Sequence, residues 1–391
     1  MYASVLLGAA GHGKMCPELS VTILPATCPP FEQISMASEE LSELRASNEA
    51  MADAEELRSR LDVDGYLFFR RLLNPQRLIK LRREMLTIMQ AGGWLVEGTD
   101  PIDGIANPAA RSTEGDPEYT DVYHQVYRLQ SFHEIAHCRE VMDVVERVRG
   151  CHMIPQPQKV ARLWFPKFTE HTTPTHQDFV HFQGTFDNLT CWSPVGACPR
   201  ELGGLAVLQG SHKVNCVLNH QFSLGAGSLH VDSAEYGQAD ADWLTTDYEI
   251  GDTLIFPALT IHKALPNVTE DRLRVSLDNR YQRVSDPIAE HMLNPHLSSM
   301  SPLSWSDVYA QWNSDEYQYY WKAYNITVLP KITKFLEQAF EEAVELARGG
   351  DERAQLHLKR IVQRDPASAQ GQRAVSVLAA YASNGQTRKA P

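Results

Sequence analysis

Two potential metal ligands lie close together in residues 175–179, which read THQDF. In an extended strand, residues two apart point to the same side, so the imidazole of His176 and the carboxylate of Asp178 are presented together while Gln177 points away. The pair alone is weak evidence for a metal site, because a hydrogen bond between a histidine and an aspartate is the commoner explanation. A third ligand elsewhere in the chain would strengthen it.

A second histidine supplies that third ligand. His262 ends the apolar part of residues 251–267, GDTLIFPALTIHKALPN, just before a Pro-Asn turn. Two histidines and one carboxylate occupy one face of an octahedral metal ion and leave three positions open, the arrangement used by non-haem Fe(II) oxygenases. The open positions suit a bidentate 2-oxo acid and then O₂. A cupin-like metal enzyme without a 2-oxo acid, such as an isomerase or a zinc hydrolase, is the alternative, and an inactive binding homologue is another.

A 2-oxo dicarboxylic acid also needs an anchor for its distal carboxylate. Residues 272–282, RLRVSLDNRYQ, begin ten residues after the second histidine. In a strand, alternate side chains share one face, and here these are Arg272, Arg274, Ser276 and Asp278. An Arg guanidinium can bind a carboxylate through two hydrogen bonds, and the serine hydroxyl can add a third. A surface ion pair is the alternative for any single arginine.

Composition limits the classes of partner. The chain has 391 residues, of which 43% are hydrophobic, and its 49 acidic residues against 36 Lys plus Arg give a formal net charge of −13. Nucleic acid is therefore not expected as a partner, because phosphate binding needs a basic surface. Seven cysteines without a C-x-x-C pair argue against a disulfide framework or a cysteine zinc site. The apolar start is too short to span a bilayer and has no basic flank, so we expect no membrane association and a cytoplasmic location.

The first part of the chain is predicted to be helical. Residues 1–36 resemble a poorly ordered leader, and residues 37–150 form the helical N-terminal part of one domain that reaches residue 283. Helices are predicted over 37–61, over 75–91 with Asn74 as N-cap, and over 135–149, with a strand in DGYLFFRRLLN. The aromatic, irregular residues 94–133 are interpreted either as a lid or as packing over the core.

The pattern of residues in the sequence changes after about residue 155. Short apolar runs alternate with Gly, Pro and Asn turns up to residue 283, which predicts an all-β sandwich or barrel. Residues 284–391 are predicted to be a helical C-terminal extension, in which residues 331–350 form an amphipathic helix. This extension could cap the barrel or form the interface of a homodimer.

Taken together, several motifs resemble the phytanoyl-CoA dioxygenase-like branch of the Fe(II)/2-oxoglutarate oxygenases. They are DGYLFFRRLLNPQRLIKLR, HQDFVHFQG, LTCWSPVG, GGLAVLQGSHK, GDTLIFPALTIHKALPN and RLRVSLDNRYQ, and they span about residues 60–283 in family order. The resemblance implies an α+β fold with a mainly β core, a cupin-like double-stranded β-helix (jelly roll) flanked by N- and C-terminal helices.

The resemblance also implies the site and its cofactors. His176, Asp178 and His262 would bind Fe(II), and Arg274 or, alternatively, Arg272 would bind 2-oxoglutarate, with Ser276 beside it. The implied reaction uses O₂, oxidises the substrate and releases succinate and CO₂. Related halogenases replace the metal carboxylate with a small residue, so Asp178 favours hydroxylation over halogenation.

Several further residues are candidates for the active-site pocket. Thr190 is a candidate hydrogen-bond partner of 2-oxoglutarate. His181 follows the metal motif and is a candidate for the substrate pocket, as are Trp164 and Trp192, for which core packing is the alternative. The sequence does not identify the substrate, and family breadth favours a small molecule such as an acyl-CoA, an amino acid or a natural product.

Overall fold

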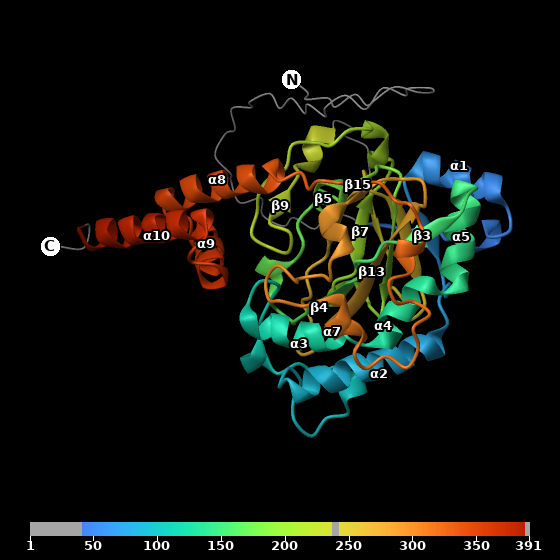
Figure 1. Ribbon diagram of the computed structural model, residues 1–391, viewed down its shortest axis with the longest axis horizontal. Coiled ribbons are helices and arrows are strands. Elements are labelled where there is room, and N and C mark those ends of the chain that lie inside the picture. The colour runs from blue at the N-terminus through green and yellow to red at the C-terminus, as the bar shows by residue number, and fades with distance from the viewer. Residues whose placement is uncertain (1–40, 237–241, 388–391) are drawn as a thin grey trace.

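Two β-sheets form the centre of the computed structural model, which describes residues 41–236 and 242–387 (Figure 1). The five-stranded sheet has the order β1 (Ser42–Glu43), β10 (Trp243–Thr245), β7 (Leu205–Leu208), β12 (Ile261–Ala264), β5 (His176–Gln177). The six-stranded sheet has the order β2 (Leu67–Phe69), β11 (Thr253–Pro257), β6 (Leu189–Pro194), β13 (Arg274–Arg283), β3 (Met153–Pro155), with β4 (Val160–Trp164) also paired to β13. The predicted jelly-roll core is confirmed, and the predicted leader lies outside the described residues.

Helices flank this core on both sides in the sequence (Figure 1). Before the main strands come α1 (Ala54–Asp64), α2 (Pro75–Ala91), α3 (Pro117–Tyr127), α4 (Gln130–Glu134) and α5 (Arg139–Arg149). The short α6 (Phe179–Phe182) follows β5, and α7 (Trp305–Tyr309), α8 (Lys334–Gly349), α9 (Glu352–Arg364) and α10 (Ala369–Thr387) follow β13. Two small sheets pair β8 (Gln221–Phe222) with β9 (Leu229–His230) and β14 (Ile288–Ala289) with β15 (Val328–Leu329).

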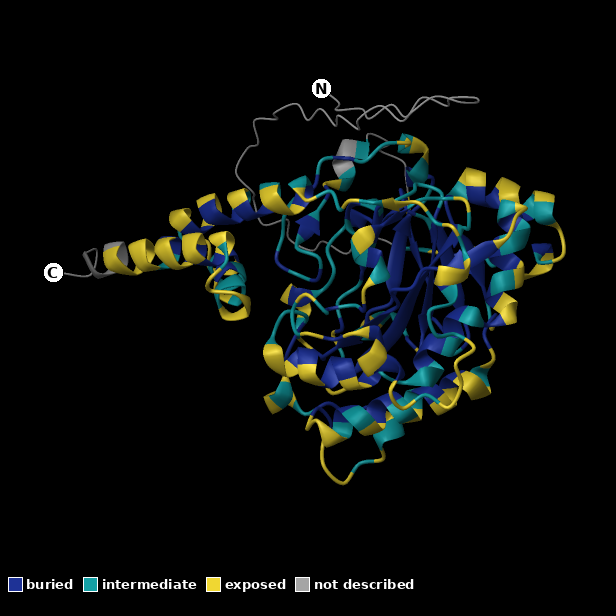
Figure 2. Ribbon diagram, in the orientation of Figure 1, coloured by how far each residue is buried: buried dark blue, intermediate teal, exposed yellow. Residues whose placement is uncertain are grey.

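Strand β13 divides two hydrophobic cores. Its odd-numbered residues Val275 and Leu277 pack with residues of α2, α3 and α5 in the larger core. Its even-numbered residues face the space between the sheets, where Trp192 and Phe256 belong to a second core. Period-two alternation in this one strand therefore fixes both the helix packing and the lining of the interior. The central strands are dark blue in Figure 2, because nearly every residue of β6, β11 and β13 is buried.

Helix α2 begins and ends where the sequence predicts. The Asn74 side chain accepts hydrogen bonds from the backbone N–H groups of Gln76 and Arg77, and Pro75 occupies the first turn. Gly92 caps the other end. One face of the helix is buried against the six-stranded sheet, with Leu78, Leu81, Met85, Leu86 and Met89 in the larger core.

The helix predicted over residues 37–61 is wrong in extent. Residues 37–40 lie outside the described part, and Ser42 and Glu43 form β1, which pairs with β10 in parallel. Helix α1 begins only after Asp53, whose side chain accepts from the N–H groups of Glu55 and Glu56. Pairing with a strand two hundred positions away overrides the local helix propensity of this segment.

The aromatic residues of 94–133 pack in the core. Trp94, Tyr119, Tyr123, Tyr127 and Phe132 are all buried and belong to the larger hydrophobic cluster. Most of them lie on α3 and α4, which the sequence did not predict. Of the two interpretations, the structure therefore supports packing.

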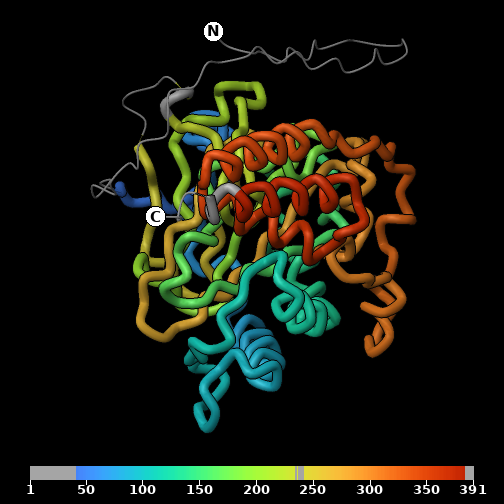
Figure 3. Tube along the Cα trace, turned by 90° about the vertical axis from the view of Figure 1, so that its left-hand side faces the viewer, coloured from blue at the N-terminus to red at the C-terminus, as the bar shows by residue number. Residues whose placement is uncertain are grey.

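The C-terminal helices form a separate bundle beside the β core, at the left of Figure 1 and in front of the core in Figure 3. They share a small apolar cluster that includes Phe340, Val344 and Leu358. The bundle contacts the rest of the protein through α8, whose Phe335 and Ala339 pack with Val180 and Leu229. It also does so through α9, where Arg360 pairs with Asp116 at 2.9 Å and Nη1 donates to His171 Nδ1 at 3.3 Å. None of the helices in the described residues is both long and apolar enough to cross a membrane.

We expect Asn74→Ala to lower the free energy of unfolding by about 1 kcal/mol, because two N–H groups at the start of α2 lose their acceptor. Chemical denaturation followed by circular dichroism measures the change. Asn313→Ala, in an exposed loop, is the matched control and should be neutral. A neutral Asn74→Ala would show that the cap contributes nothing.

Candidate metal centre

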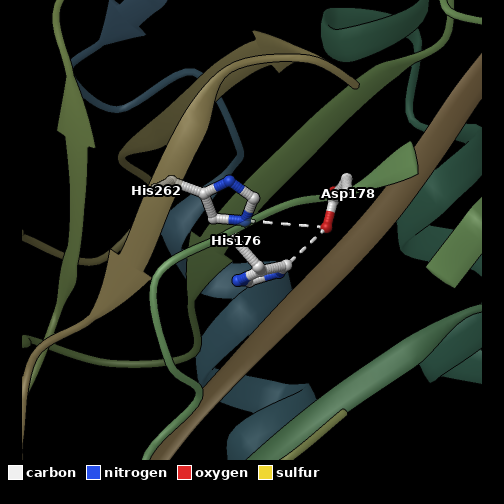
Figure 4. Close-up of side chains that lie close together, drawn as sticks. All are labelled: His176, Asp178 and His262. Atoms are coloured by element: carbon white, nitrogen blue, oxygen red, sulfur yellow. Dashed lines mark ion pairs between the residues drawn. The ribbon is translucent and has the colours of Figure 1, made fainter. Parts of the chain in front are cut away.

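The two histidines of the candidate centre face each other across neighbouring strands. Strands β5 and β12 are antiparallel, and His176 is the direct partner of His262. The centroids of their imidazole rings lie 4.2 Å apart. The chain does not stay extended through Asp178, as the sequence suggested, because it turns there into α6 with helical backbone angles. This turn directs the carboxylate toward the two imidazoles (Figure 4).

Three ligand atoms converge. Oδ1 of Asp178 lies 3.3 Å from Nε2 of His176 and 3.6 Å from Nε2 of His262. All three residues are buried, and their ligand atoms lie within 4.8 Å of one another. Figure 4 shows both imidazoles pointing at the same carboxylate oxygen.

Hydrogen bonds fix the tautomer of both histidines. Nδ1 of His176 lies 2.7 Å from the carbonyl oxygen of Pro174, and Nδ1 of His262 lies 2.9 Å from that of Thr260. A carbonyl only accepts, so each Nδ1 carries the hydrogen and each Nε2 presents a lone pair. In this tautomer of the neutral rings, two lone pairs and a carboxylate oxygen face one another. Asp178 Oδ1 accordingly has no hydrogen-bond partner among the described residues, and a cation fits there.

The ionisation of these groups also suits a metal. Burial alone would raise the pKa of Asp178, but the Arg280 guanidinium offsets this and holds the pKa well below its usual value. Burial and the neighbouring His176 lower the pKa of His262 to about 3. At neutral pH the aspartate is charged and His262 is neutral, as metal ligation requires.

The other oxygen of Asp178 is held by the protein. Oδ2 accepts from Thr190 Oγ1 at 2.5 Å and from Arg280 Nη2 at 3.1 Å. Thr190, predicted as a contact of 2-oxoglutarate, is thus placed behind Asp178. Arg280 was not predicted, although it is the next even-numbered residue after Asp278 on the same face of β13.

A buried arginine lies in the same pocket. Arg274 donates to the carbonyl of Gly203 at 2.9 Å and to Ser276 Oγ at 2.7 Å. Its guanidinium carbon lies 5.6 and 5.9 Å from the ring centroids of Trp164 and Trp192. Burial lowers the pKa of Arg274 to about 10, so it stays charged at neutral pH, yet no carboxylate pairs with it in the described part of the chain. A buried cation without an anion suits an anionic ligand.

The strand in which side chains were predicted to alternate from Arg272 onward begins only at Arg274. Arg272 lies two residues before the start of β13. Its side chain is 52% exposed and contacts Asp271 and the carbonyl of Asp103. It lies outside the pocket that holds the three candidate ligands. That pocket is lined by Arg162, Thr173, His176, Asp178, Thr190, Trp192, Leu205, Phe256, His262, Ala264, Arg274, Asp278 and Arg280.

Of the three substrate-pocket candidates, Trp192 lines this pocket and the other two pack behind it. The Trp192 indole N–H donates to Ser276 Oγ at 3.1 Å, which places the ring near Arg274. Trp164 also packs near the Arg274 guanidinium. The His181 ring packs edge-on against His176, with centroids 5.3 Å apart.

Comparison with known proteins identifies the family. The phytanoyl-CoA dioxygenase family model matches residues 61–275. The 1-deoxypentalenic acid 11-beta-hydroxylase of Streptomyces arenae is 29% identical over 254 residues, 62% of this chain and 86% of that protein. The enzyme of the same name from Streptomyces exfoliatus is 35% identical over 129 residues, 32% of this chain and 45% of that protein.

Two solved structures show more distant similarity. One is the non-heme alpha-ketoglutarate-dependent carbocyclase SnoK from nogalamycin biosynthesis, with 16% identity, a TM-score of 0.43 and coverage of 60% of this chain and 87% of that one. The other is EctD from S. alaskensis with bound Fe, with 17% identity, a TM-score of 0.42 and coverage of 63% and 82%. Since the family model spans more than half of the 391 residues, the chain belongs to the phytanoyl-CoA dioxygenase family and is an oxygenase that uses Fe(II), 2-oxoglutarate and O₂.

Proposed function

We propose that His176, Asp178 and His262 hold Fe(II), that Arg274 and Ser276 bind the distal carboxylate of 2-oxoglutarate, and that the enzyme hydroxylates a small molecule. The observation that carries the proposal is the unpartnered Oδ1 of Asp178, which faces two fixed Nε2 lone pairs in a pocket that also contains an unpaired arginine. When bound, Fe(II) and 2-oxoglutarate supply the oxidising chemistry, with succinate and CO₂ as products.

The chain's own residues position these groups. The Ser276 hydroxyl accepts from Arg274 and Trp192, so its hydrogen is left to donate to the carboxylate that Arg274 binds. Thr190 and Arg280 hold one oxygen of Asp178 and leave the other for the metal. Phe256 and Leu205 line the pocket with apolar surface that excludes water.

Arg274 favours this function over a cupin-like metal enzyme without a 2-oxo acid. Such an enzyme has no need of a buried guanidinium that lacks a carboxylate partner. The intact ligand set argues against an inactive homologue. A cytoplasmic location and a homodimer through residues 284–391 stay predictions.

Anaerobic calorimetry with Fe(II) tests the proposal directly. We expect 2-oxoglutarate to bind in the presence of Fe(II), and succinate to form slowly under air without a substrate. No binding of 2-oxoglutarate to the Fe(II)-loaded protein would reject the proposed function.

We expect Arg274→Met to raise the Kd for 2-oxoglutarate about 10- to 100-fold, because charge-assisted hydrogen bonds to the carboxylate are lost. Calorimetry on the anaerobic Fe(II) protein measures the change. Arg272→Met is the matched control, since that side chain is exposed outside the pocket, and it should bind 2-oxoglutarate normally. The reverse pattern would assign the anchor to Arg272.

We expect Arg280→Met to weaken metal binding about 10- to 100-fold, the usual effect of removing a partner of a metal ligand. Titration with Mn(II), followed by electron paramagnetic resonance, reports the affinity without turnover. Arg283→Met, on the same strand but paired with Asp187, is the control and should retain wild-type affinity. If both variants bind Mn(II) like the wild type, Arg280 does not position Asp178.

A further inference from the structure

Asp278 places a carboxylate in the pocket with one oxygen unused. It lies on the inner face of β13 between Ser276 and Arg280, and only 7% of the residue is exposed. Its Oδ2 accepts from Arg162 Nε at 3.1 Å. Its Oδ1 is buried and has no hydrogen-bond partner among the described residues. The residue lines the same pocket as the candidate metal ligands.

The protein holds this carboxylate in place from both sides. Arg162 is clamped between Asp278 and Glu114, to which its Nη1 donates at 2.5 Å. Burial alone would lower the pKa of Arg162, but Glu114 and Asp278 offset this and raise it, so the guanidinium stays charged. On the other side, Arg280 donates to the backbone carbonyl of Asp278 at 3.3 Å. Oδ1 is therefore a preoriented acceptor.

Neither the proposed metal nor the proposed cosubstrate satisfies this acceptor. The metal is assigned to Oδ1 of Asp178 and the two histidines, and 2-oxoglutarate carries only acceptor oxygens. Leaving a buried acceptor without a donor is unfavourable, and a ligand with an O–H group removes that penalty on binding.

The charges around the pocket show what kind of donor fits. The buried charged side chains at the pocket are the cations Arg162, Arg274 and Arg280 and the anions Asp178, Asp278 and, behind Arg162, Glu114. Three positive charges balance three negative ones. Fe(II) and the 2-oxoglutarate dianion also cancel. A charged group on the substrate would therefore be buried without a counter-ion, whereas a neutral hydroxyl needs none.

We infer that Asp278 is the hydrogen-bond acceptor of a substrate subsite, and that the substrate is a neutral molecule that presents a hydroxyl group to it. This inference rests on the proposed function, because the pocket that Asp278 lines is the one assigned to the reaction. It makes Asp278 a specificity-determining residue and disfavours a substrate that places a carboxylate or an amine at this point.

Two matched probe molecules, and a variant that replaces the acceptor oxygen with an amide donor, test the subsite. Cyclohexanol, which donates and accepts, and cyclohexanone, which only accepts, are titrated into wild type, Asp278→Asn and the control Asp271→Asn by ligand-observed NMR, anaerobically, with and without Fe(II) and 2-oxoglutarate. In Asp278→Asn the Arg162 N–H donates to the amide oxygen, as it does to Oδ2 in the wild type, so the amide N–H₂ faces the pocket. Asp271 has a half-exposed side chain outside the pocket, so its variant controls for the loss of one charge.

We expect the wild type and Asp271→Asn to bind cyclohexanol about tenfold more tightly than cyclohexanone, and Asp278→Asn to lose that preference, because its amide N–H₂ can donate to the oxygen of either probe. Equal affinities in the wild type, an unchanged preference in Asp278→Asn, or no binding of either probe would overturn the inference. Calorimetry with 2-oxoglutarate on the same three proteins separates the claims. Failure of the wild type to bind 2-oxoglutarate contradicts the proposed function, whereas normal binding without the alcohol preference contradicts only the subsite.

Discussion

The structure depends on the different partners of the two carboxylate oxygens of Asp178. One oxygen is fixed by the hydroxyl of Thr190 and the guanidinium of Arg280, and the other has no protein partner and faces the Nε2 atoms of two histidines. Four strands and a turn must be in register for this to occur, because β5, β6, β12 and β13 each supply a residue. The buried charge is tolerable only because a cation lies behind it and, in our account, a metal ion lies in front.

Strand β13 links the fold to the chemistry. Its outward residues anchor the helices, and its inward residues supply, in order, Arg274, Ser276, Asp278 and Arg280. A shift of one residue in its pairing with β6 would exchange the two sets, exposing the charges to the apolar core and the leucines to the pocket. Core packing and site geometry therefore select the same register.

The sequence predicted the features that local rules govern. Asn74 caps α2 because an amide at that position accepts free N–H groups, and residues 274–278 alternate because a strand has period two. The convergence of His176, Asp178 and His262 was also predicted, through the order of the motifs. What the sequence did not give depends on long-range register. Arg280 meets Asp178 across 102 positions, Thr190 turns toward Asp178 through the pairing of β6, and β1 replaces a predicted helix because β10 pairs with it.

A crystal structure of the protein grown anaerobically with Fe(II) and 2-oxoglutarate tests the proposed metal and cosubstrate site most directly. We expect iron bound by Nε2 of His176, Nε2 of His262 and Oδ1 of Asp178, with Oδ2 still on Thr190 and Arg280 and the distal carboxylate of 2-oxoglutarate on Arg274. Iron at another site, chelation of the metal by both oxygens of Asp178, or 2-oxoglutarate bound away from Arg274 would contradict it.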